Sequence, residues 1–311
     1  MDTSAKIYIA GHNGLVGSAI ARKLKTKGFN NLILKTRAEL DLLDQQATAE
    51  FFQKEKPEYV FLAAAKVGGI VSNQTYPADF IYQNLTVQNN IIRQAHLSGV
   101  KKLLFLGSSC IYPRECQQPI KEEYLLTGPL EETNKPYAVA KIAGIIECQS
   151  YNRQYGTNFI SVMPTNLYGQ NDNFDLQNSH VLPALLRKFH EAKINNSQET
   201  VVWGTGSARR EFLHVDDLAD ACIFLINNYD QGEIINIGTG EDVSIKEIAE
   251  TIKNITGFSG KITWDKSKPD GTARKLLDVS KIHDLGWRHK INLADGLKSY
   301  YQWYLENKKN D

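Results

Sequence analysis

Residues 6–17 read KIYIAGHNGLVG, an apolar run that leads directly into glycines at positions 11, 14 and 17. The run predicts a buried strand, and the glycines predict a tight turn into a helix. Glycine lets the backbone approach a pyrophosphate, whose charge the N-terminal end of the helix stabilises. Glycines also serve ordinary strand-to-helix turns, but this context favours dinucleotide binding. The residues of this predicted site are Gly11, His12, Asn13, Gly14, Leu15, Val16 and Gly17.

The same alternation of apolar runs and helical periodicity continues to about residue 165. Further buried strands are expected at residues 31–36, 58–64, 101–107 and 158–163, and helices at 14–27, 45–55, 77–98 and 135–155. Continuous apolar strands separated by helices are typical of a parallel sheet that is covered on both faces. The predicted fold class is therefore α/β, with a Rossmann-type doubly wound parallel sheet.

Beyond residue 165 the pattern becomes less regular. Short strands are expected at 201–204 and 261–264, and helices at 180–193, 244–256 and 293–307. We expect residues 1–165 to form a dinucleotide-binding domain and residues 166–311 to form mainly a smaller, interleaved substrate lobe. The apolar run IINIGTG at 234–240 indicates that segments near 210–240 return to the main sheet. Exposed loops are expected at 114–135 and 265–275, which are rich in Pro, Gly or charge.

Composition places the chain among ordinary globular proteins. It has 311 residues, of which 42% are hydrophobic and 23% charged, with a formal net charge of +1. This charge argues against a broad nucleic-acid-binding surface, and no apolar run is long enough to span a membrane. The cysteines at positions 110, 116, 148 and 222 have neither zinc-site nor CxxC spacing. We therefore expect no metal, and reduced thiols in the cytoplasm.

The end of the second expected strand indicates which cofactor fits. In NAD-binding members of this fold, an acidic residue about 20 positions after the glycine turn bonds the ribose. Here the segment reads Lys35-Thr36-Arg37, without a carboxylate. Arg37 can form a two-pronged contact with a 2′-phosphate, which favours NADP(H). A solvated arginine at a strand end is the alternative reading.

Two further segments are candidates for cofactor contacts. Asp41 lies where this fold often bonds near the adenine, although it could equally cap a helix. Ala63, Ala64 and Ala65 follow the third expected strand. Small residues there let a cofactor pass close to the backbone, or let a helix pack tightly on the sheet.

A tyrosine and a lysine four residues apart, Tyr137 and Lys141, indicate carbonyl chemistry. At this spacing they share one face of a helix, and the ammonium is expected to lower the pKa of the phenol. Ser108, at the end of the fourth expected strand, can hydrogen-bond the same carbonyl oxygen. With a hydride carrier present, these side chains would protonate an alkoxide as the hydride arrives.

The glycine turn, Ser108, Tyr137 and Lys141 follow one another in the order and spacing of the short-chain dehydrogenases/reductases, which the chain resembles. Its length and C-terminal lobe resemble the extended branch that acts on nucleotide sugars. The most specific resemblance covers essentially the whole chain. It lies in AAAKVGGIVSNQTYPADFIYQN (63–84), GSSCIYP (107–113), SVMPTNLYG (161–169), REFLHVDD (210–217) and KPDGTARKLLDV (268–279).

The resemblance implies a two-stage reaction on GDP-4-keto-6-deoxy-D-mannose: epimerisation at positions 3 and 5, then reduction of the 4-keto group by NADPH. By resemblance, Cys110 is the base and His180 the acid of the epimerisation. A thiol can be activated by nearby positive charge, and histidine titrates near neutral pH. Judged from the residues alone, Cys110 could equally be a small buried filler and His180 a structural histidine.

The resemblance also implies ligand-binding residues. Pro164, Thr165, Asn166 and Leu167 match a family segment near the nicotinamide, although the proline could simply mark a strand exit. The other expected cofactor contacts are Leu42, Leu106, Gly107, Ser108, Ser109, Tyr137, Lys141 and His180. The expected nucleotide-sugar contacts are Lys188, Trp203, Arg210 and Asp270. Lys188 stands where the family can have arginine, and Trp203 could instead belong to the core.

Two other functions remain open. One is an epimerase or dehydratase of another nucleotide sugar that retains NAD. Arg37 argues against it, as does the lack of a Glu beside Ser108, where Ser109 and Cys110 stand instead. The other is a non-catalytic NADP-sensing regulator, against which the intact Tyr137/Lys141 pair argues. In related enzymes the helices equivalent to 77–98 and 135–155 build a dimer seam, so a homodimer is expected.

Overall fold

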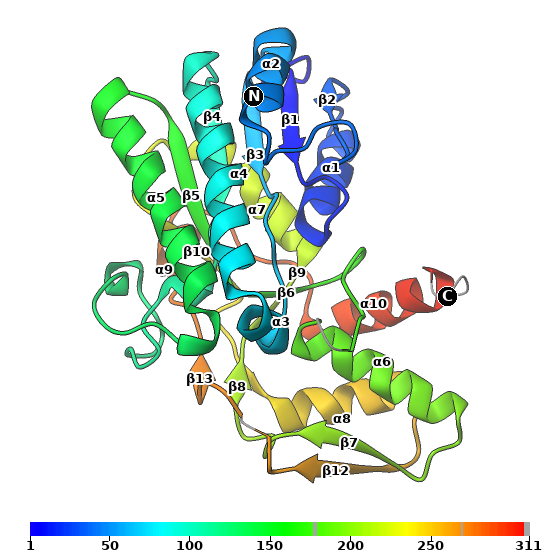
Figure 1. The fold of residues 1–311 in the computed structure, drawn as a ribbon. Helices are drawn as coiled ribbons and strands as arrows, with labels where there is room; N and C mark the ends of the chain where they lie inside the picture. Colours follow the sequence, from blue (N-terminus) through cyan, green and yellow to red (C-terminus); the bar gives the residue numbers. More distant parts are fainter. Residues whose placement is uncertain (177–178, 269, 308–311) are drawn as a thin grey trace.

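The computed structural model describes residues 1–176, 179–268 and 270–307. Six strands form one sheet, in the order β10-β5-β4-β3-β1-β2 (Figure 1). Every neighbouring pair in it is parallel. The strands are β1 Ile7–Ala10, β2 Leu32–Ile33, β3 Tyr59–Leu62, β4 Lys102–Leu106, β5 Phe159–Pro164 and β10 Ile235–Ile237. β1, β4, β5 and β10 are buried along their whole length, as strands between two helical layers must be.

Helices cover both faces of this sheet. α4 (Pro77–Leu97) packs against α2 (Gln45–Glu55) and α5 (Lys135–Tyr155), and α1 (Leu15–Thr26) packs against α7 (Val215–Asn228). α4 and α5 lie side by side in Figure 1, and the Gln88 amide of α4 donates to the Ala140 carbonyl of α5 at 2.9 Å. The doubly wound α/β fold predicted from the sequence is confirmed.

A second hydrophobic cluster lies below the sheet in Figure 1. Its elements are α6 (Val181–Ile194), α8 (Ile245–Thr256), α10 (Leu293–Asn307) and the parallel strands β7 (Glu199–Trp203) and β12 (Lys261–Asp265). The chain also forms two further small sheets. One has three strands in the order β11 (Val243–Ser244), β8 (Arg209–Arg210) and β13 (Arg274–Lys275), and the other pairs β6 (Asn166–Tyr168) with β9 (Phe212–His214). The remaining elements are α3 (Ile70–Thr75), α9 (Ser280–Asp284) and the 3-10 turns η1 (Ser109–Ile111), η2 (Glu122–Tyr124) and η3 (Glu132–Asn134).

The chain returns from the lower elements to the main sheet. After β9, α7 packs on the sheet, and β10 then pairs with β5, where Ile235 lies opposite Val162. Within the run IINIGTG, Ile235–Ile237 therefore form an edge strand of the main sheet. The division of the chain at residue 165 stays a prediction.

Two local expectations need correction. The strand expected at 31–36 spans only β2, because this edge strand pairs with β1 alone and the chain turns at Thr36, whose carbonyl accepts from two later amides. The segment 114–135 is more than an exposed loop, since Ile120 is 2% exposed and forms a β-bridge with Leu277. In the segment 265–275, Pro269 lies outside the described residues and the last two residues form β13.

Candidate active site

The glycine turn joins β1 to α1 at the carboxyl edge of the sheet. Gly11 has a φ of +85°, and a Cβ there would lie 2.8 Å from the Ala64 nitrogen. A Cβ on Gly17 would lie 2.2 Å from the Gly11 carbonyl oxygen. Both positions therefore need glycine. Because Gly14 begins α1 without a side-chain cap, the cradle fits a pyrophosphate at the start of this helix.

The segment expected to meet the adenosine part of the cofactor is exposed. The Arg37 side chain is 74% exposed, and its Nε lies 3.9 Å from Asp41 Oδ1. Asp41 does not cap α2, because Asp44 caps that helix by accepting a hydrogen bond from the Ala47 amide. An exposed guanidinium with one long ion pair can reach a 2′-phosphate, so the residues present fit NADP(H). The Leu42 carbonyl, nearby in the chain, accepts a hydrogen bond from Asn90.

The residues after β4 bring Cys110 toward the same edge. A Cβ on Gly107 would lie 2.5 Å from the Met163 sulfur, so the strand exit packs tightly against β5. Ser108 caps η1, and its Oγ accepts a hydrogen bond from the Cys110 amide at 3.2 Å. Ser109, the first residue of η1, is buried. The exit from β4 thus fixes Ser108 and Cys110 in one short turn.

The segment after β5 is held by hydrogen bonds to neighbouring loops. Pro164 is the last residue of β5, and the Thr165 amide donates to the Ile237 carbonyl of β10 at 3.0 Å. The Asn166 amide group donates to the Glu211 carbonyl at 2.9 Å, and Leu167 continues into β6. Both readings of Pro164 survive, because a strand exit marked by proline also lies at the carboxyl edge where a cofactor binds.

Tyr137 and Lys141 lie on one face of α5, and burial governs both. Burial raises the pKa of Tyr137 above its usual range, the charge of Cys110 raises it further, and a hydrogen bond with Ser108 lowers it. Burial lowers the pKa of Lys141 to about 7. The Lys141 ammonium donates to the Leu106 carbonyl at 2.7 Å and lies 5.9 Å from the centre of the Tyr137 ring. The expectation that Lys141 lowers the phenol pKa is therefore wrong for this structure.

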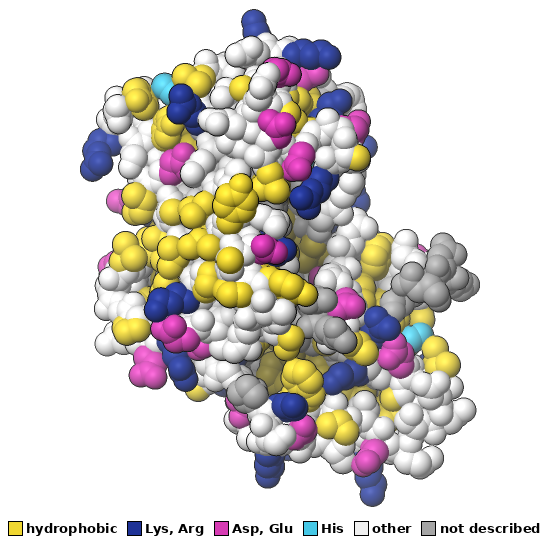
Figure 2. All heavy atoms as spheres, viewed as in Figure 1, with side chains coloured by type: hydrophobic (Ala, Val, Ile, Leu, Met, Phe, Trp, Pro, Cys, Tyr) yellow, Lys and Arg dark blue, Asp and Glu magenta, His cyan; other side chains and the backbone are white. Residues whose placement is uncertain are grey.

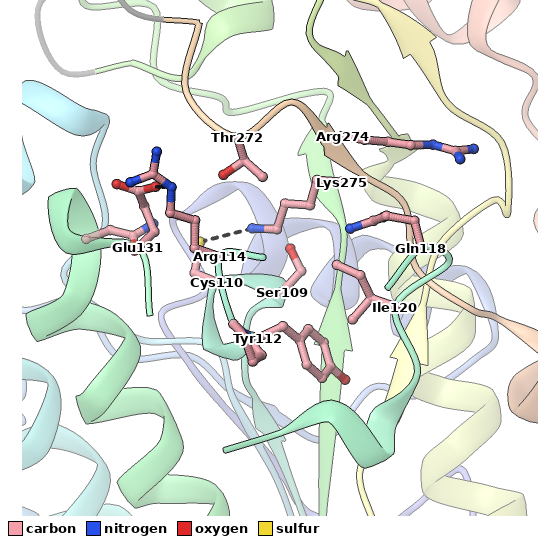
Figure 3. A pocket seen from close by; sticks show the side chains of 12 residues that line it. Ser109, Cys110, Tyr112, Arg114, Gln118, Ile120, Glu131, Thr272, Arg274 and Lys275 are labelled. Atoms are coloured by element: carbon pink, nitrogen blue, oxygen red, sulfur yellow. Dashed lines mark hydrogen bonds and ion pairs between the residues drawn. The ribbon is translucent and has the colours of Figure 1, made fainter. Parts of the chain in front are cut away.

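Cys110 lies in a small polar cavity and has a cation beside its sulfur. Lys275 of β13 donates to the Cys110 Sγ at 3.5 Å, the contact drawn as a dashed line in Figure 3. Burial alone would raise the pKa of the Cys110 thiol, but the charge of Lys275, hydrogen bonds from Ser108 and Lys275, and the charge of Arg210 outweigh it. The net pKa lies below its usual value. The sequence reading of Cys110 as an inert filler does not fit this environment.

His180 is placed by the beginning of α6, where it is the N-cap residue without a side-chain capping bond. His180 is an exposed residue, but the protein atoms around its ring remove part of the water that would otherwise solvate it. This desolvation lowers the pKa of His180, and the charge of Lys275 lowers it further. Lys275 therefore acts on both predicted epimerisation residues, Cys110 in η1 and His180 at the N-cap of α6.

The expected nucleotide-sugar residues form an exposed aromatic and cationic surface. Trp203 is 52% exposed, so it does not belong to the core. The Lys188 ammonium lies 5.2 Å from the centre of the Trp203 ring, and that of Lys268 lies 5.4 Å from it. Lys268 was not predicted as a contact. An exposed indole flanked by two ammonium groups is suited to an anionic, ring-bearing ligand.

Arg210 and Asp270 are already tied into local structure. Arg210 donates to the Arg209 carbonyl at 2.8 Å and to the Asp270 carbonyl at 3.4 Å. The Asp270 carboxylate accepts hydrogen bonds of 2.7 Å from the amide and the hydroxyl of Thr205. Asp270 therefore shapes the turn after β7, and its carboxylate has fewer free sites for a ligand than expected. Arg209 forms an ion pair with Asp242 at 2.7 Å.

Two functional candidates were missed from the sequence. Lys275 stands in the run KPDGTARKLLDV but is 165 positions from Cys110, and no spacing rule links residues so far apart. Glu211 is fully buried and accepts backbone hydrogen bonds from Thr239, Gly240 and Leu277. Its place between Arg210 and the apolar Phe212 and Leu213 was a signal for such a role, since a carboxylate that is buried is rarely left unpaired.

Some features that would indicate other chemistry are lacking in the part of the chain that the structure describes. It holds no group of three or more His, Cys, Asp or Glu side chains able to bind a metal ion. No helix within the described ranges has the length and apolar character needed to cross a membrane. Cys110, Cys116, Cys148 and Cys222 are all free thiols.

Comparison with known proteins agrees with this site. The model of the NAD dependent epimerase/dehydratase family matches residues 7–238. The chain is 63% identical over 306 residues to GDP-L-fucose synthase 1 of Arabidopsis thaliana, covering 98% of this chain and 95% of that one. It is 58% identical over 311 residues to the GDP-L-fucose synthase of Escherichia coli (strain K12), covering 97% of each.

Solved structures agree as well. A GDP-mannoheptose C4 reductase from Campylobacter jejuni with NADP bound has a TM-score of 0.91 and 51% identity, covering 98% of this chain and 99% of that one. Because the family model spans most of the chain and the curated relatives span nearly all of it, the protein is an NAD(P)-binding enzyme. The chain belongs to the NAD dependent epimerase/dehydratase family.

Proposed function

We propose that the enzyme converts GDP-4-keto-6-deoxy-D-mannose to GDP-L-fucose by 3,5-epimerisation and NADPH-dependent reduction of the 4-keto group. One observation carries the proposal: the Cys110/Lys275 contact adjoins the Ser108/Tyr137/Lys141 set, and the charge of Cys110 acts on Tyr137. Carbon acid chemistry and carbonyl reduction thus share one site. Two GDP-L-fucose synthases at 63% and 58% identity support the same assignment.

We assign the cofactor site to the glycine turn, Arg37 and the residues after β3, β4 and β5. NADPH supplies the hydride when bound there. Support for NADP over NAD comes from the exposed Arg37, from the lack of a carboxylate at the end of β2, and from the NADP-bound reductase at 51% identity. In the same proposal, residues 1–165 with the returning segment near 210–240 bind the cofactor, and residues 166–311 bind mainly the nucleotide sugar.

In the epimerisation, the Cys110 thiolate removes the proton from the carbon next to the 4-ketone. The electron pair of that C–H bond moves to the carbonyl oxygen and forms an enolate. His180 returns a proton to the opposite face of the carbon. Cys110 then releases its proton to solvent and His180 takes one up, so that the two transfers can repeat at the second position. The lowered pKa of Cys110 favours the base form that this step needs.

In the reduction, hydride adds to carbon 4 and the carbonyl oxygen takes a proton from the Tyr137 hydroxyl. Burial raises the pKa of Tyr137, which keeps the phenol protonated and able to donate at neutral pH. Ser108 hydrogen-bonds the phenol and lies beside the carbonyl oxygen in this scheme. Lys141 donates to the Leu106 carbonyl, and burial lowers its pKa to about 7, so part of it is protonated at neutral pH. This protonated form supplies positive charge near the developing alkoxide.

We also propose that the enzyme works as a homodimer through α4 and α5. Figure 2 shows hydrophobic side chains gathered over the face where these helices lie. Tyr82 of α4 is 65% exposed, and Val139 and Ile146 of α5 are 39% and 43% exposed. A stripe of this kind on two adjacent helices is suited to a second copy of the same face. The free thiols are consistent with a cytoplasmic enzyme.

A reductase that acts without epimerising is the second candidate, because the C4 reductase from Campylobacter jejuni is 51% identical over nearly the full length. Incubation of the enzyme with GDP-4-keto-6-deoxy-D-mannose in D₂O distinguishes the two. With NADPH, we expect cofactor oxidation and GDP-L-fucose that carries deuterium at positions 3 and 5. A reduced, unepimerised sugar without deuterium would support the second candidate. No oxidation of NADPH or NADH would refute both.

Two variants separate the stages of the main proposal. Tyr137→Phe keeps the ring and removes the proton donor, so it should lose reduction and still exchange deuterium into the sugar. Cys110→Ser should lose deuterium exchange and slowly reduce the unepimerised ketone. Unchanged exchange in Cys110→Ser would remove Cys110 from the mechanism.

A further inference from the structure

The cavity at Cys110 is completed by an element far away in the sequence. Lys275 is the last residue of β13 and lines this cavity, and its side chain points toward Cys110 (Figure 3). The Lys275 ammonium lies 3.5 Å from the Cys110 sulfur. The ammonium donates to the sulfur. None of the ion pairs between described residues includes Lys275.

We propose that Lys275 is the cation that keeps Cys110 in its thiolate form for proton abstraction, an inference that rests on the epimerisation proposed above. The thiolate takes the carbon-bound proton and becomes a neutral thiol, while the negative charge moves to the enolate oxygen. Lys275 keeps its three protons throughout. It acts through the sulfur, and it removes the need for a separate base to deprotonate Cys110.

The backbone that follows Lys275 is fixed by three hydrogen bonds, so the contact is a built feature of the fold. The Leu276 amide donates to Gln118 Oε1 at 2.9 Å, and its carbonyl accepts from the Ile120 amide at 2.7 Å. The Leu277 amide donates to Glu211 Oε2 at 3.0 Å. With the following segment anchored in this way, the Lys275 side chain has a fixed origin from which it reaches the sulfur.

Other charged groups near the sulfur have different partners. Arg210 of β8 acts on Cys110 by charge but donates to the carbonyls of Arg209 and Asp270. The charge of Cys110 raises the pKa of Tyr137 in α5. The charge of Lys275 lowers the pKa of His180, at the N-cap of α6, and that of Cys116. The other charged residues that line the cavity are paired: Arg114 with Glu131 at 3.4 Å, and Arg274 with Asp242. Lys275 is the cation in direct contact with the sulfur.

The test is the pH dependence of Cys110 alkylation, which needs no substrate. Protein without added ligand is treated with iodoacetamide at a series of pH values, digested with trypsin and measured by mass spectrometry. Cys110 falls in the peptide 103–114 and Cys116 in the peptide 115–121, so each thiol is followed separately. In Lys275→Met, which keeps the length and removes the charge, the midpoint for Cys110 should rise by about 1–3 pH units.

Two matched variants guard against a structural explanation. Lys275→Arg restores a cation and should return the midpoint toward that of the wild type. Lys298→Met removes one charge from α10, where the side chain is 68% exposed, and should leave the midpoint unchanged. A midpoint that stays the same in Lys275→Met, or one that moves equally in Lys298→Met, overturns the proposal.

Deuterium exchange into GDP-4-keto-6-deoxy-D-mannose then links the thiol to the reaction. In Lys275→Met, exchange at pH 7 should fall at least about 10-fold and recover as the pH rises, because one unit of pKa changes the thiolate fraction about 10-fold. Loss of exchange at every pH overturns the assigned role. If the wild type shows an acidic thiol that depends on Lys275 but no exchange, the proposed function fails while the cysteine–lysine pair stands.

Discussion

Burial brings the pKa of Lys141 close to neutral pH. The residue is 3% exposed, and its hydrogen-bond partner is the neutral carbonyl of Leu106 rather than a carboxylate. Burial lowers its pKa from 10.5 to about 7 in the folded protein. The folded chain therefore releases this proton far more easily than the unfolded chain does.

The shift predicts how stability changes with pH. As the pH rises from 7 toward 10, the unfolded chain keeps the Lys141 proton while the folded chain progressively loses it. The free energy of unfolding should therefore rise with pH over this range, with a contribution of up to about 1.4 kcal/mol per pH unit. Below about pH 7 both states are protonated and this contribution is flat. Urea unfolding at pH 7, 8 and 9, without added cofactor, measures it.

The matched variant is Lys141→Met, which keeps much of the side-chain volume and has no charge to titrate. Its stability should depend less steeply on pH than that of the wild type between pH 7 and pH 9. Equal slopes for the two proteins would show that Lys141 remains charged in the folded state and that its pKa is not lowered.

Single residues were predictable where spacing alone places them together. The four-residue spacing of Tyr137 and Lys141 put both on one helical face, and the apolar run before Ser108 put it at a strand end. The direction of the Tyr137 shift was not predictable in the same way, because it depends on burial and on the distance to Lys141. Lys275 was missed because tertiary structure alone brings it to Cys110.

Glu211 joins three segments and so controls how short elements are arranged. Its Oε1 accepts from the amides of Thr239 and Gly240 at 2.6 and 2.8 Å, and its Oε2 accepts from Leu277 at 3.0 Å. These bonds connect β8 and β9 to the turn after β10 and to the segment after β13. A carboxylate suits this place, because all three partners are donors.

Replacing Glu211 with Gln should destabilise the fold while nearly keeping the side-chain shape. The new amide group is itself a donor and must face at least one backbone N–H, which leaves a buried donor without an acceptor. We expect a loss of about 1–3 kcal/mol in the free energy of unfolding, measured by urea denaturation. The control is Glu241→Gln, an exposed neutralisation two residues from Thr239 that should change stability little. Equal effects of both variants would contradict the role given to Glu211.

Long elements were predictable because their periodicity extends over many residues. α2 and α5 begin and end at the expected residues, and α8 and α10 differ from expectation by one residue at most. The short strands β6, β8, β9, β11 and β13 span only two or three residues and carry no period of their own. They form because their backbone groups pair with those of partner strands, and that pairing is tertiary information.

For the whole molecule, the sequence predicted the main sheet and the return of the chain to it near residues 234–240. It did not predict how the elements outside that sheet, such as β7 and β13, pack at the edge where the active site lies. The glycine turn, Ser108 and Tyr137 belong to one continuous α/β pattern and could be grouped from their order alone. The contact between η1 and β13, and the exposed Trp203 between two lysines, depend on how separate elements pack. These parts of the site therefore came from the structure.

The exposed apolar face of α4 and α5 predicts the assembly state. If two copies meet there, Ile146→Glu places a charge in the seam without touching the active site, and the protein should become monomeric at micromolar concentration. Light scattering coupled to size-exclusion chromatography measures the mass. Ile194→Glu is the matched control, since this residue ends α6 and is 62% exposed, compared with 43% for Ile146. A wild type of 35.0 kDa would refute the dimer, whereas dissociation by both variants would refute its location on α4 and α5.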